Sequence, residues 1–187
     1  ALDELISFPN IARAISAFIR QQIYINNPWY AYVLDSEHGL SNSAKRGAIL
    51  FYTSADPGTA NNHGADCARC HGGATFSIPD QSESPTFVRR VGFPQIGEGR
   101  GCPNSSNPDF SDSNDCGRHN ISGDPEDLFK FRVPTLLNIE CTKPYGHTGS
   151  FVSLDQVVQF FDEPYQVSES YFAENRLCDL PQFKSVG

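Results

Sequence analysis

Cys67-Ala68-Arg69-Cys70-His71 is the stretch of sequence that decides the fold. Its C-x-x-C-H pattern is typical of covalent c-type haem attachment, in which the two thiols form thioethers with the haem vinyl groups. The imidazole that follows is placed to bind the iron, so His71 is the predicted metal ligand. Gly72 and Gly73 come next, and they would let the backbone pass close to the porphyrin edge.

Two other interpretations of Cys67 and Cys70 compete with haem attachment. A thioredoxin-like redox motif needs a βαβ context, and no such pattern is visible around residues 67–71. A zinc site needs a second C-x-x-C or H-x-x-x-H pair, which the sequence lacks. The pattern therefore favours one covalently bound haem c.

Four further cysteines indicate the compartment. Haem c is attached outside the cytoplasm, where disulfides also persist, so the sequence predicts a periplasmic or otherwise extracytoplasmic protein. An even number of remaining cysteines favours two bridges, and we expect Cys102–Cys116 and Cys141–Cys178. The alternative is that one or more of them are free buried thiols.

The composition is that of a folded globular protein. The chain has 187 residues, 39% of them hydrophobic, and a net charge of −8, which argues against a nucleic-acid partner. No stretch approaches the roughly 18 apolar residues of a membrane span, so no transmembrane segment is predicted. Because the chain contains no Met, we expect Ala1 to lie downstream of a removed or missing segment. A processed mature chain and a fragment of a longer protein both stay open.

Hydrophobic spacing predicts a mainly α fold with long irregular loops that wrap the haem. A first amphipathic helix is expected after Asn10 as N-cap, a second after Ser41 or Ser43, and a last one after Ser153, with Gln156 at capping-box spacing. On the last helix, the apolar stripe is expected to comprise Leu154, Val157, Val158 and Phe161.

The region between these helices, from residue 56 to about 131, is rich in Gly, Pro, Ser, Asn and Asp, and it contains no convincing strand pattern. We therefore expect a single cytochrome c-like domain over 1–187. It would have a leading segment 1–40, a haem-binding core 41–162 and a tail 163–187.

Two segments carry a resemblance to a known family. Residues 131–139 read FRVPTLLNI and residues 144–150 read PYGHTGS, with supporting matches at 122–127, at 92–97 and in the first helix with its Asn-Pro-Trp-Tyr sequel. Together they cover most of residues 9–162. The chain resembles the C-terminal haem domain of bacterial di-haem cytochrome c peroxidases and MauG-like proteins.

This resemblance implies two c-type haem domains in one polypeptide, of which the N-terminal one reacts with peroxide and the C-terminal one relays electrons. The chain has one C-x-x-C-H and is similar to the second half. Its expected partners are a second haem domain or redox partner protein and a small electron-donor protein. The sequence indicates part of an oxidoreductase and leaves open whether the chain is itself an enzyme. The alternative is a stand-alone or subunit electron-transfer cytochrome without peroxidase activity.

The chain departs from the family at the sixth ligand of this haem. The family uses a Met or Tyr on the helix after Pro-Tyr-x-His-x-Gly, but the chain has no Met, and the matching position is Phe161, whose ring cannot bind iron. We expect Phe161 to face the haem pocket. Tyr165 could substitute only if the chain turned back, and Leu137 stands where the family usually has Arg.

Five more side chains are candidates for the site or its surroundings. His147 lies in the family motif and would be a distal ligand or a proton-handling catalytic group, the alternative being a structural histidine. Arg132 would pair with a haem propionate, or else is a surface cation. His38, His63 and His119 are expected to be exposed.

Calcium is the last cofactor that the sequence leaves open. The family binds calcium between its domains, but Asp109, Asp112 and Asp115 lack the EF-hand spacing.

Overall fold

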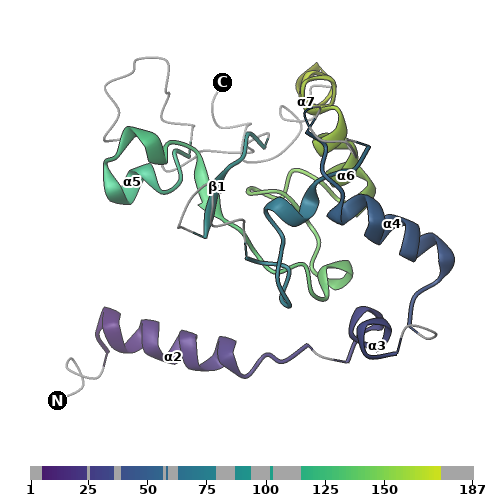
Figure 1. The fold of residues 1–187 in the computed structure, drawn as a ribbon. Coiled ribbons are helices and arrows are strands. Elements are labelled where there is room, and N and C mark those ends of the chain that lie inside the picture. The colour runs from purple at the N-terminus through teal and green to yellow at the C-terminus, as the bar shows by residue number, and fades with distance from the viewer. Residues whose placement is uncertain are drawn as a thin grey trace. The chain divides into compact units, whose positions relative to one another are not determined.

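The computed structural model describes residues 6–24, 26–35, 39–56, 58, 63–78, 87–93, 102 and 115–173. The chain divides into two compact units, residues 1–47 and 48–187. The described part is mainly helical, as predicted, and no helix within it is both long and apolar enough to cross a bilayer. Figure 1 shows the order of the elements along the chain.

The first unit begins with the predicted amphipathic helix. α2 (Phe8–Arg20) starts two residues before Asn10, so the predicted N-cap is wrong: Ser7 holds that place. The reason is Pro9, whose fixed φ and missing N–H suit the first turn of a helix. Asn10 instead accepts a hydrogen bond from Arg13 at 3.2 Å. The apolar residues of α2 are exposed, among them Ile11, Ile15, Phe18 and Ile19.

Two further helices follow along the chain. α3 (Pro28–Leu34) is capped by Asn27, whose side chain accepts from the Tyr30 amide at 3.0 Å. α4 (Asn42–Tyr52) follows Ser41, whose hydroxyl accepts from the Ala44 amide at 3.1 Å. Of the two predicted caps, Ser41 is therefore the one used.

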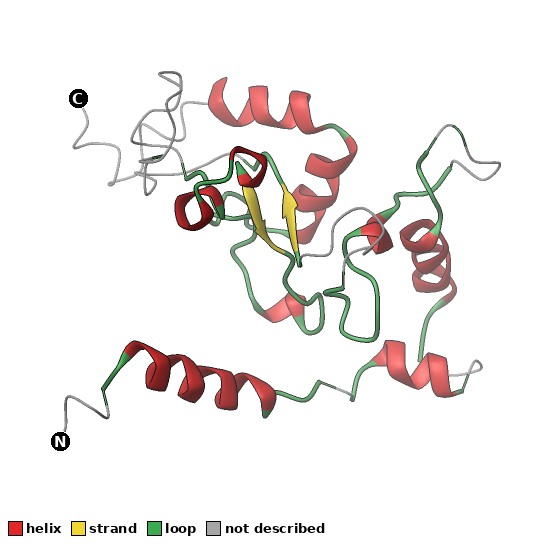
Figure 2. Cartoon of the chain, turned by 60° about the vertical axis from the view of Figure 1, so that its left-hand side comes forward, coloured by secondary structure: helices red, strands yellow, loops and turns green. Residues whose placement is uncertain are grey.

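The second unit contains a small sheet that the sequence did not predict. β1 (Val88–Arg90) and β2 (Lys130–Arg132) pair antiparallel, with Val88 opposite Arg132 and Arg90 opposite Lys130. Figure 2 shows the two strands side by side in yellow. Strands of three residues are too short to give a period-two pattern, which is why the sequence gave no signal.

Short helical turns and two helices complete the second unit. The turns are η1 (Cys67–Arg69), α5 (His119–Ser122), η2 (Pro125–Asp127) and η3 (Ile139–Cys141), and the helices are α6 (Leu154–Asp162) and α7 (Pro164–Ala173), which contact each other. The predicted cap of α6 is confirmed, because the Ser153 hydroxyl accepts from the Gln156 amide at 3.3 Å. The Gln156 side chain in turn accepts a hydrogen bond from the amide of Val152, the residue before the cap.

Aromatic side chains make the core of this unit. Phe160 is 4% exposed and stacks on Phe93, with ring centroids 4.9 Å apart, and Phe151 lies 5.5 Å away. The buried face of α6 thus centres on Phe160, which the predicted stripe left out. Val158 and Phe161 are exposed instead.

Asp127, at the end of η2, forms hydrogen bonds with two basic side chains. Asp127 accepts hydrogen bonds from Arg118 Nε at 2.8 Å and Lys130 Nζ at 3.3 Å. Burial alone would raise the pKa of Asp127, but hydrogen bonds from Ser122, Arg118 and Lys130 outweigh it and hold this pKa below its ordinary value.

We predict that Asp127→Asn lowers the free energy of unfolding at neutral pH by up to about 1 kcal/mol. A carboxyl group whose pKa is lower in the folded than in the unfolded protein stabilises the fold above its ordinary pKa of about 4. This stabilisation is lost as the pH falls through the pKa of the folded state. Urea unfolding at pH 7 and near pH 2 should therefore show a difference that disappears in acid. Glu126→Gln, at an exposed neighbour, is the control and should change stability at neither pH. A defect of equal size at both pH values would contradict the charge argument.

Candidate functional site

The C-x-x-C-H segment forms a tight turn joined to the end of α4. The Asp66 amide donates to the Thr53 carbonyl at 3.0 Å, and the Ala65 amide donates to the Leu50 carbonyl at 2.8 Å. Gly64 lies so close to Thr53 that a Cβ there would overlap its carbonyl oxygen. The turn is therefore fixed to a regular helix rather than carried on a loose loop.

His71 is held by the loop that follows it. Two backbone hydrogen bonds between Gly72 and Ile78, at 3.0 and 3.1 Å, close this loop. Within it, Phe76 has a φ of +50°, a left-handed conformation that is costly for a bulky residue. The Phe76 ring packs edge-on against Phe51, with centroids 5.8 Å apart. This conformation directs the Phe76 carbonyl toward the histidine.

The hydrogen bond to Phe76 decides which nitrogen of His71 is available. His71 Nδ1 lies 3.0 Å from the Phe76 carbonyl oxygen, and a carbonyl can only accept, so Nδ1 carries the proton. Burial lowers the pKa of His71, against the opposing effect of the Phe76 and Pro134 carbonyls. A neutral ring protonated at Nδ1 presents Nε2 as a lone-pair donor, the arrangement that a metal-ligating histidine requires.

Both cysteines of the turn are available for covalent chemistry. Cys67 and Cys70 are half-buried and neither forms a disulfide. Burial raises the pKa of the Cys67 thiol, helped by Asp66 and Cys70 and opposed by a backbone hydrogen bond, so the protonated thiol is favoured. Two thiols and an imidazole with its lone pair on Nε2, all on one turn, are the donor set that covalent haem attachment needs. The residues fit this cofactor.

The family-like segment around Val133 lies against the same turn. The Thr135 hydroxyl donates to the Thr75 carbonyl at 2.5 Å, and the amide of the buried Val133 donates to the Phe87 carbonyl at 2.9 Å. These contacts bring residues far apart in the sequence to one site, next to His71.

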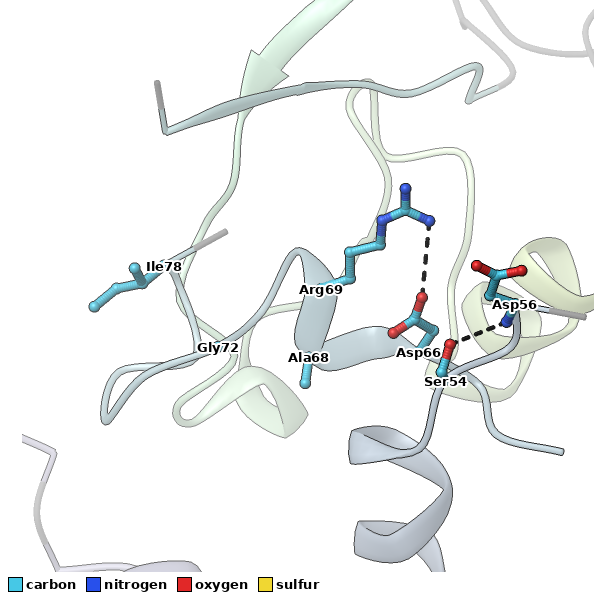
Figure 3. A pocket seen from close by; sticks show the side chains of 7 residues that line it. All are labelled: Ser54, Asp56, Asp66, Ala68, Arg69, Gly72 and Ile78. Atoms are coloured by element: carbon cyan, nitrogen blue, oxygen red, sulfur yellow. Dashed lines mark hydrogen bonds and ion pairs between the residues drawn. The ribbon is translucent and has the colours of Figure 1, made fainter. Parts of the chain in front are cut away.

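An open, polar depression of about 550 Å³ lies on one side of the turn. Ala68 and Arg69, the two residues between the cysteines, line it, and Arg69 forms a 3.8 Å ion pair with Asp66 (Figure 3). The remaining lining residues are Ser54, Asp56, Gly72 and Ile78. Its mostly polar, open lining makes it a solvated surface rather than an enclosed substrate site.

His147 lies at the tip of a closed loop. Tyr145 and Phe151 exchange two backbone hydrogen bonds of 2.7 and 3.0 Å, and Gly146 supplies the positive φ that the loop needs. The His147 ring lies 3.8 Å from the Phe131 ring, and its Nε2 lies 2.9 Å from Asp115 Oδ2. From the sequence, Asp115 is a candidate only for a calcium-binding loop. No local pattern indicates its contact with His147, because 32 residues separate the two.

The other predicted site residues are more exposed. Arg132 is exposed at the end of β2, and Tyr165 is exposed on α7. Phe161 is 59% exposed and meets Phe93 edge-on, with centroids 5.6 Å apart. The roles of Arg132 and Phe161 beside a haem stay predictions. His63 is exposed as expected, and His38, Asp109 and Asp112 lie outside the described residues.

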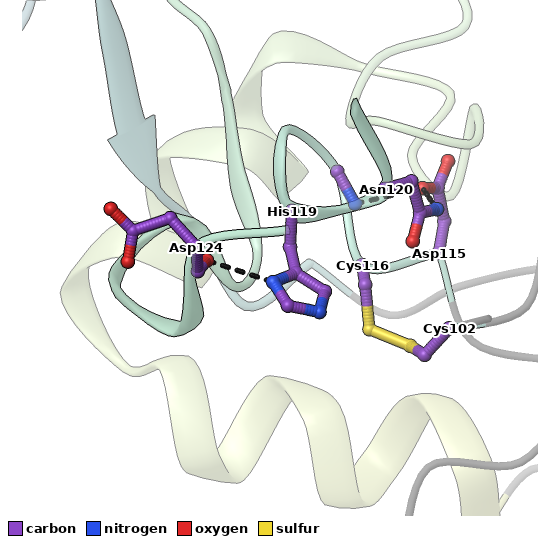
Figure 4. The surroundings of a disulfide bond; sticks show 7 residues. Cys102, Asp115, Cys116, His119, Asn120 and Asp124 are labelled. Carbon is purple, nitrogen blue, oxygen red and sulfur yellow. Dashed lines mark hydrogen bonds between the residues drawn. A yellow bond between two sulfur atoms is a disulfide. The ribbon is translucent and has the colours of Figure 1, made fainter. Parts of the chain in front are cut away.

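His119 corrects an expectation. It was predicted to be exposed, but it is 2% exposed, because α5, which lies between Gly117 and Gly123 at positive φ, packs against η2. Its Nδ1 lies 2.7 Å from the Asp124 carbonyl, and its Nε2 is buried without a hydrogen-bond partner among the described residues. Figure 4 shows the ring close to a disulfide.

That disulfide joins Cys102 and Cys116, as predicted. Cys141 is exposed and is bonded to no cysteine in the described part of the chain. Cys178 lies outside the described residues, so its pairing with Cys141 stays a prediction. The described residues contain no group of three or more His, Cys, Asp or Glu side chains that could hold a metal ion.

Comparison with known proteins identifies the relatives of this chain. Cytochrome-c peroxidase IdrP1 of Pseudomonas sp. (strain SCT) is 29% identical over 164 residues, which are 80% of this chain and 39% of that protein. Methylamine utilization protein MauG of Methylophilus methylotrophus is 25% identical over 182 residues, which are 97% of this chain and 44% of that protein. A solved structure of a MauG-like protein associated with microbial copper homeostasis is similar at a TM-score of 0.50 and 29% identity, covering 83% of this chain and 43% of that one.

The chain is a homologue of the di-haem cytochrome c peroxidase and MauG-like family. No family model matches it. It spans less than half the length of the cytochrome c peroxidases and MauG proteins that it matches. Their names imply a c-type haem, in agreement with the donor set of the turn.

We predict that the Cys102→Ala/Cys116→Ala double variant loses about 3 kcal/mol of stability, because the bridge closes a loop of 14 residues. Urea unfolding followed by far-ultraviolet circular dichroism measures the change. Cys141→Ala, an exposed cysteine outside this bridge, should cost less. Equal stability of the double variant and the unaltered chain would show that the bridge does not form in the protein.

Proposed function

We propose that the chain is a c-type haem redox domain that passes electrons through one covalent haem, as the electron-relay half of a di-haem cytochrome c peroxidase or MauG-like protein. The observation that carries this proposal is the His71 Nδ1 hydrogen bond to Phe76, which places the lone pair of the neutral ring on Nε2, in the same turn as two thiols. A haem bound there supplies a one-electron couple. Cys67 and Cys70 would tether it, and His71 would bind the iron.

The rest of the proposal follows from the family. Arg132 would pair with a propionate and Phe161 would cover the haem on its open side. The partners would be a second haem domain and a small electron-donor protein, in the periplasm or another extracytoplasmic compartment. A stand-alone or subunit electron-transfer cytochrome without peroxidase activity is the second candidate.

His147 is proposed as a proton-handling group rather than an iron ligand. Its Nε2 is engaged by Asp115 at 2.9 Å, and its ring face is covered by Phe131. A nitrogen that donates a hydrogen bond has no lone pair, so Nε2 can offer none to a metal and the lone pair of the neutral ring lies on Nδ1, where we propose that it accepts protons. With Phe161 at the family's ligand position and no Met in the chain, the sixth position would be open or filled by water.

We predict that the haem is bound covalently and once. After denaturation, acidic organic solvent should leave the haem on the unaltered polypeptide, but should release it from the Cys67→Ala/Cys70→Ala variant. Cys141→Ala is the matched control and should retain the haem. Free haem extracted from the unaltered chain would end the proposal.

We predict a high-spin ferric haem by electron paramagnetic resonance, with a spectrum that His147→Ala does not convert to another spin state. Strong-field bis-histidine ligation would give a low-spin signal instead. His63→Ala, at an exposed histidine, is the control. A low-spin signal that disappears only in His147→Ala would make His147 an iron ligand and move the protein to the pure electron carriers.

A further inference from the structure

Asp115 uses its two carboxylate oxygens for two different contacts. Oδ1 accepts a hydrogen bond from the Gly117 amide at 2.9 Å, which closes a turn between the side chain and the backbone that follows it. The same oxygen lies 3.5 Å from Asn120 Nδ2. Oδ2 lies 2.9 Å from His147 Nε2. One oxygen therefore fixes the carboxylate and leaves the other directed at the histidine.

The backbone around Asp115 is fixed as well. Cys116 is fully buried in the disulfide with Cys102, and its carbonyl accepts from the Phe129 amide at 3.0 Å. Gly117 has a φ of +61°, and a Cβ there would crowd the Lys130 carbonyl. Figure 4 shows Asp115 next to Cys116 in this turn. Rotation of the carboxylate away from His147 would break the bond to Gly117.

An ionised carboxylate only accepts hydrogen bonds, so His147 Nε2 must carry a proton in this pair. In the neutral ring the lone pair then lies on Nδ1. Among the described residues, Asp115 is the hydrogen-bond partner of this ring, and Phe131 fixes its plane.

We propose that Asp115 is a positioning residue that holds His147 in the Nε2–H tautomer, so that Nδ1 is the atom that exchanges protons. The inference rests on the proposed role of His147. In the step it supports, the O–H or C–H bond of a weak acid breaks, the proton goes to Nδ1, the electron pair stays on the conjugate base, and Asp115 stabilises the imidazolium.

The test is Asp115→Asn. The amide oxygen can keep the bond to Gly117, but the amide nitrogen then faces His147 Nε2 and donates to it, which moves the ring proton to Nδ1. Asp56→Asn is the matched control, because Asp56 Oδ1 makes the same turn with the Gly58 amide at 2.8 Å. Imidazole ¹⁵N shifts, measured in the reduced, carbon-monoxide-treated holoprotein, report the tautomer.

We expect Nε2–H in the unaltered protein and in Asp56→Asn, and Nδ1–H in Asp115→Asn. Nδ1–H in the unaltered protein would overturn the inference even if the variant failed to fold. Nε2–H in a folded Asp115→Asn would overturn it too.

A second measurement separates this inference from the proposed function. The rate at which the ferric holoprotein binds cyanide from hydrogen cyanide, which must lose a proton, should fall by about 10²-fold in Asp115→Asn. A changed tautomer with an unchanged rate would sustain the role of Asp115 and end the proposed role of His147. A changed rate with an unchanged tautomer would end the role of Asp115.

Discussion

The hydrogen bond from His71 Nδ1 to the Phe76 carbonyl is the constraint on which the site depends. It requires Phe76 in a left-handed conformation, which costs on the order of 1–3 kcal/mol. The Gly72–Ile78 bridge and the Phe51 contact keep the loop in that form. The backbone of this loop thus holds the His71 ring in one tautomer and one orientation.

A second set of contacts positions the His147 side chain. The disulfide and the hydrogen bond to the Gly117 amide hold Asp115 in place, and Asp115 in turn holds the ring of His147. His147 lies on a loop 32 residues further along the chain. Both histidines therefore show the same principle. One ring nitrogen is engaged by a group that can only accept, and the other is left for chemistry.

The sequence predicted what is encoded locally. The Ser41 and Ser153 caps depend on residues within three positions, and both were found. The sheet was missed because its strands are short, and the burial of His119 was missed because charged and polar neighbours surround it in the sequence. The pairing of Asp115 with His147 depends on tertiary contact alone. On α6, Phe160 and Phe161 are adjacent, and the sequence pattern did not indicate that Phe160 is the buried one.

The pairing of β1 with β2 has a consequence for the order of assembly. The thiols and the imidazole lie within five consecutive residues, whereas Arg90 meets Lys130 only after the chain between them has closed into a long loop. Closing such a loop costs entropy that local turns do not incur. The turn of residues 67–71 can therefore form while the chain between β1 and β2 is still open, and its two thiols stay accessible until the tertiary contacts cover them.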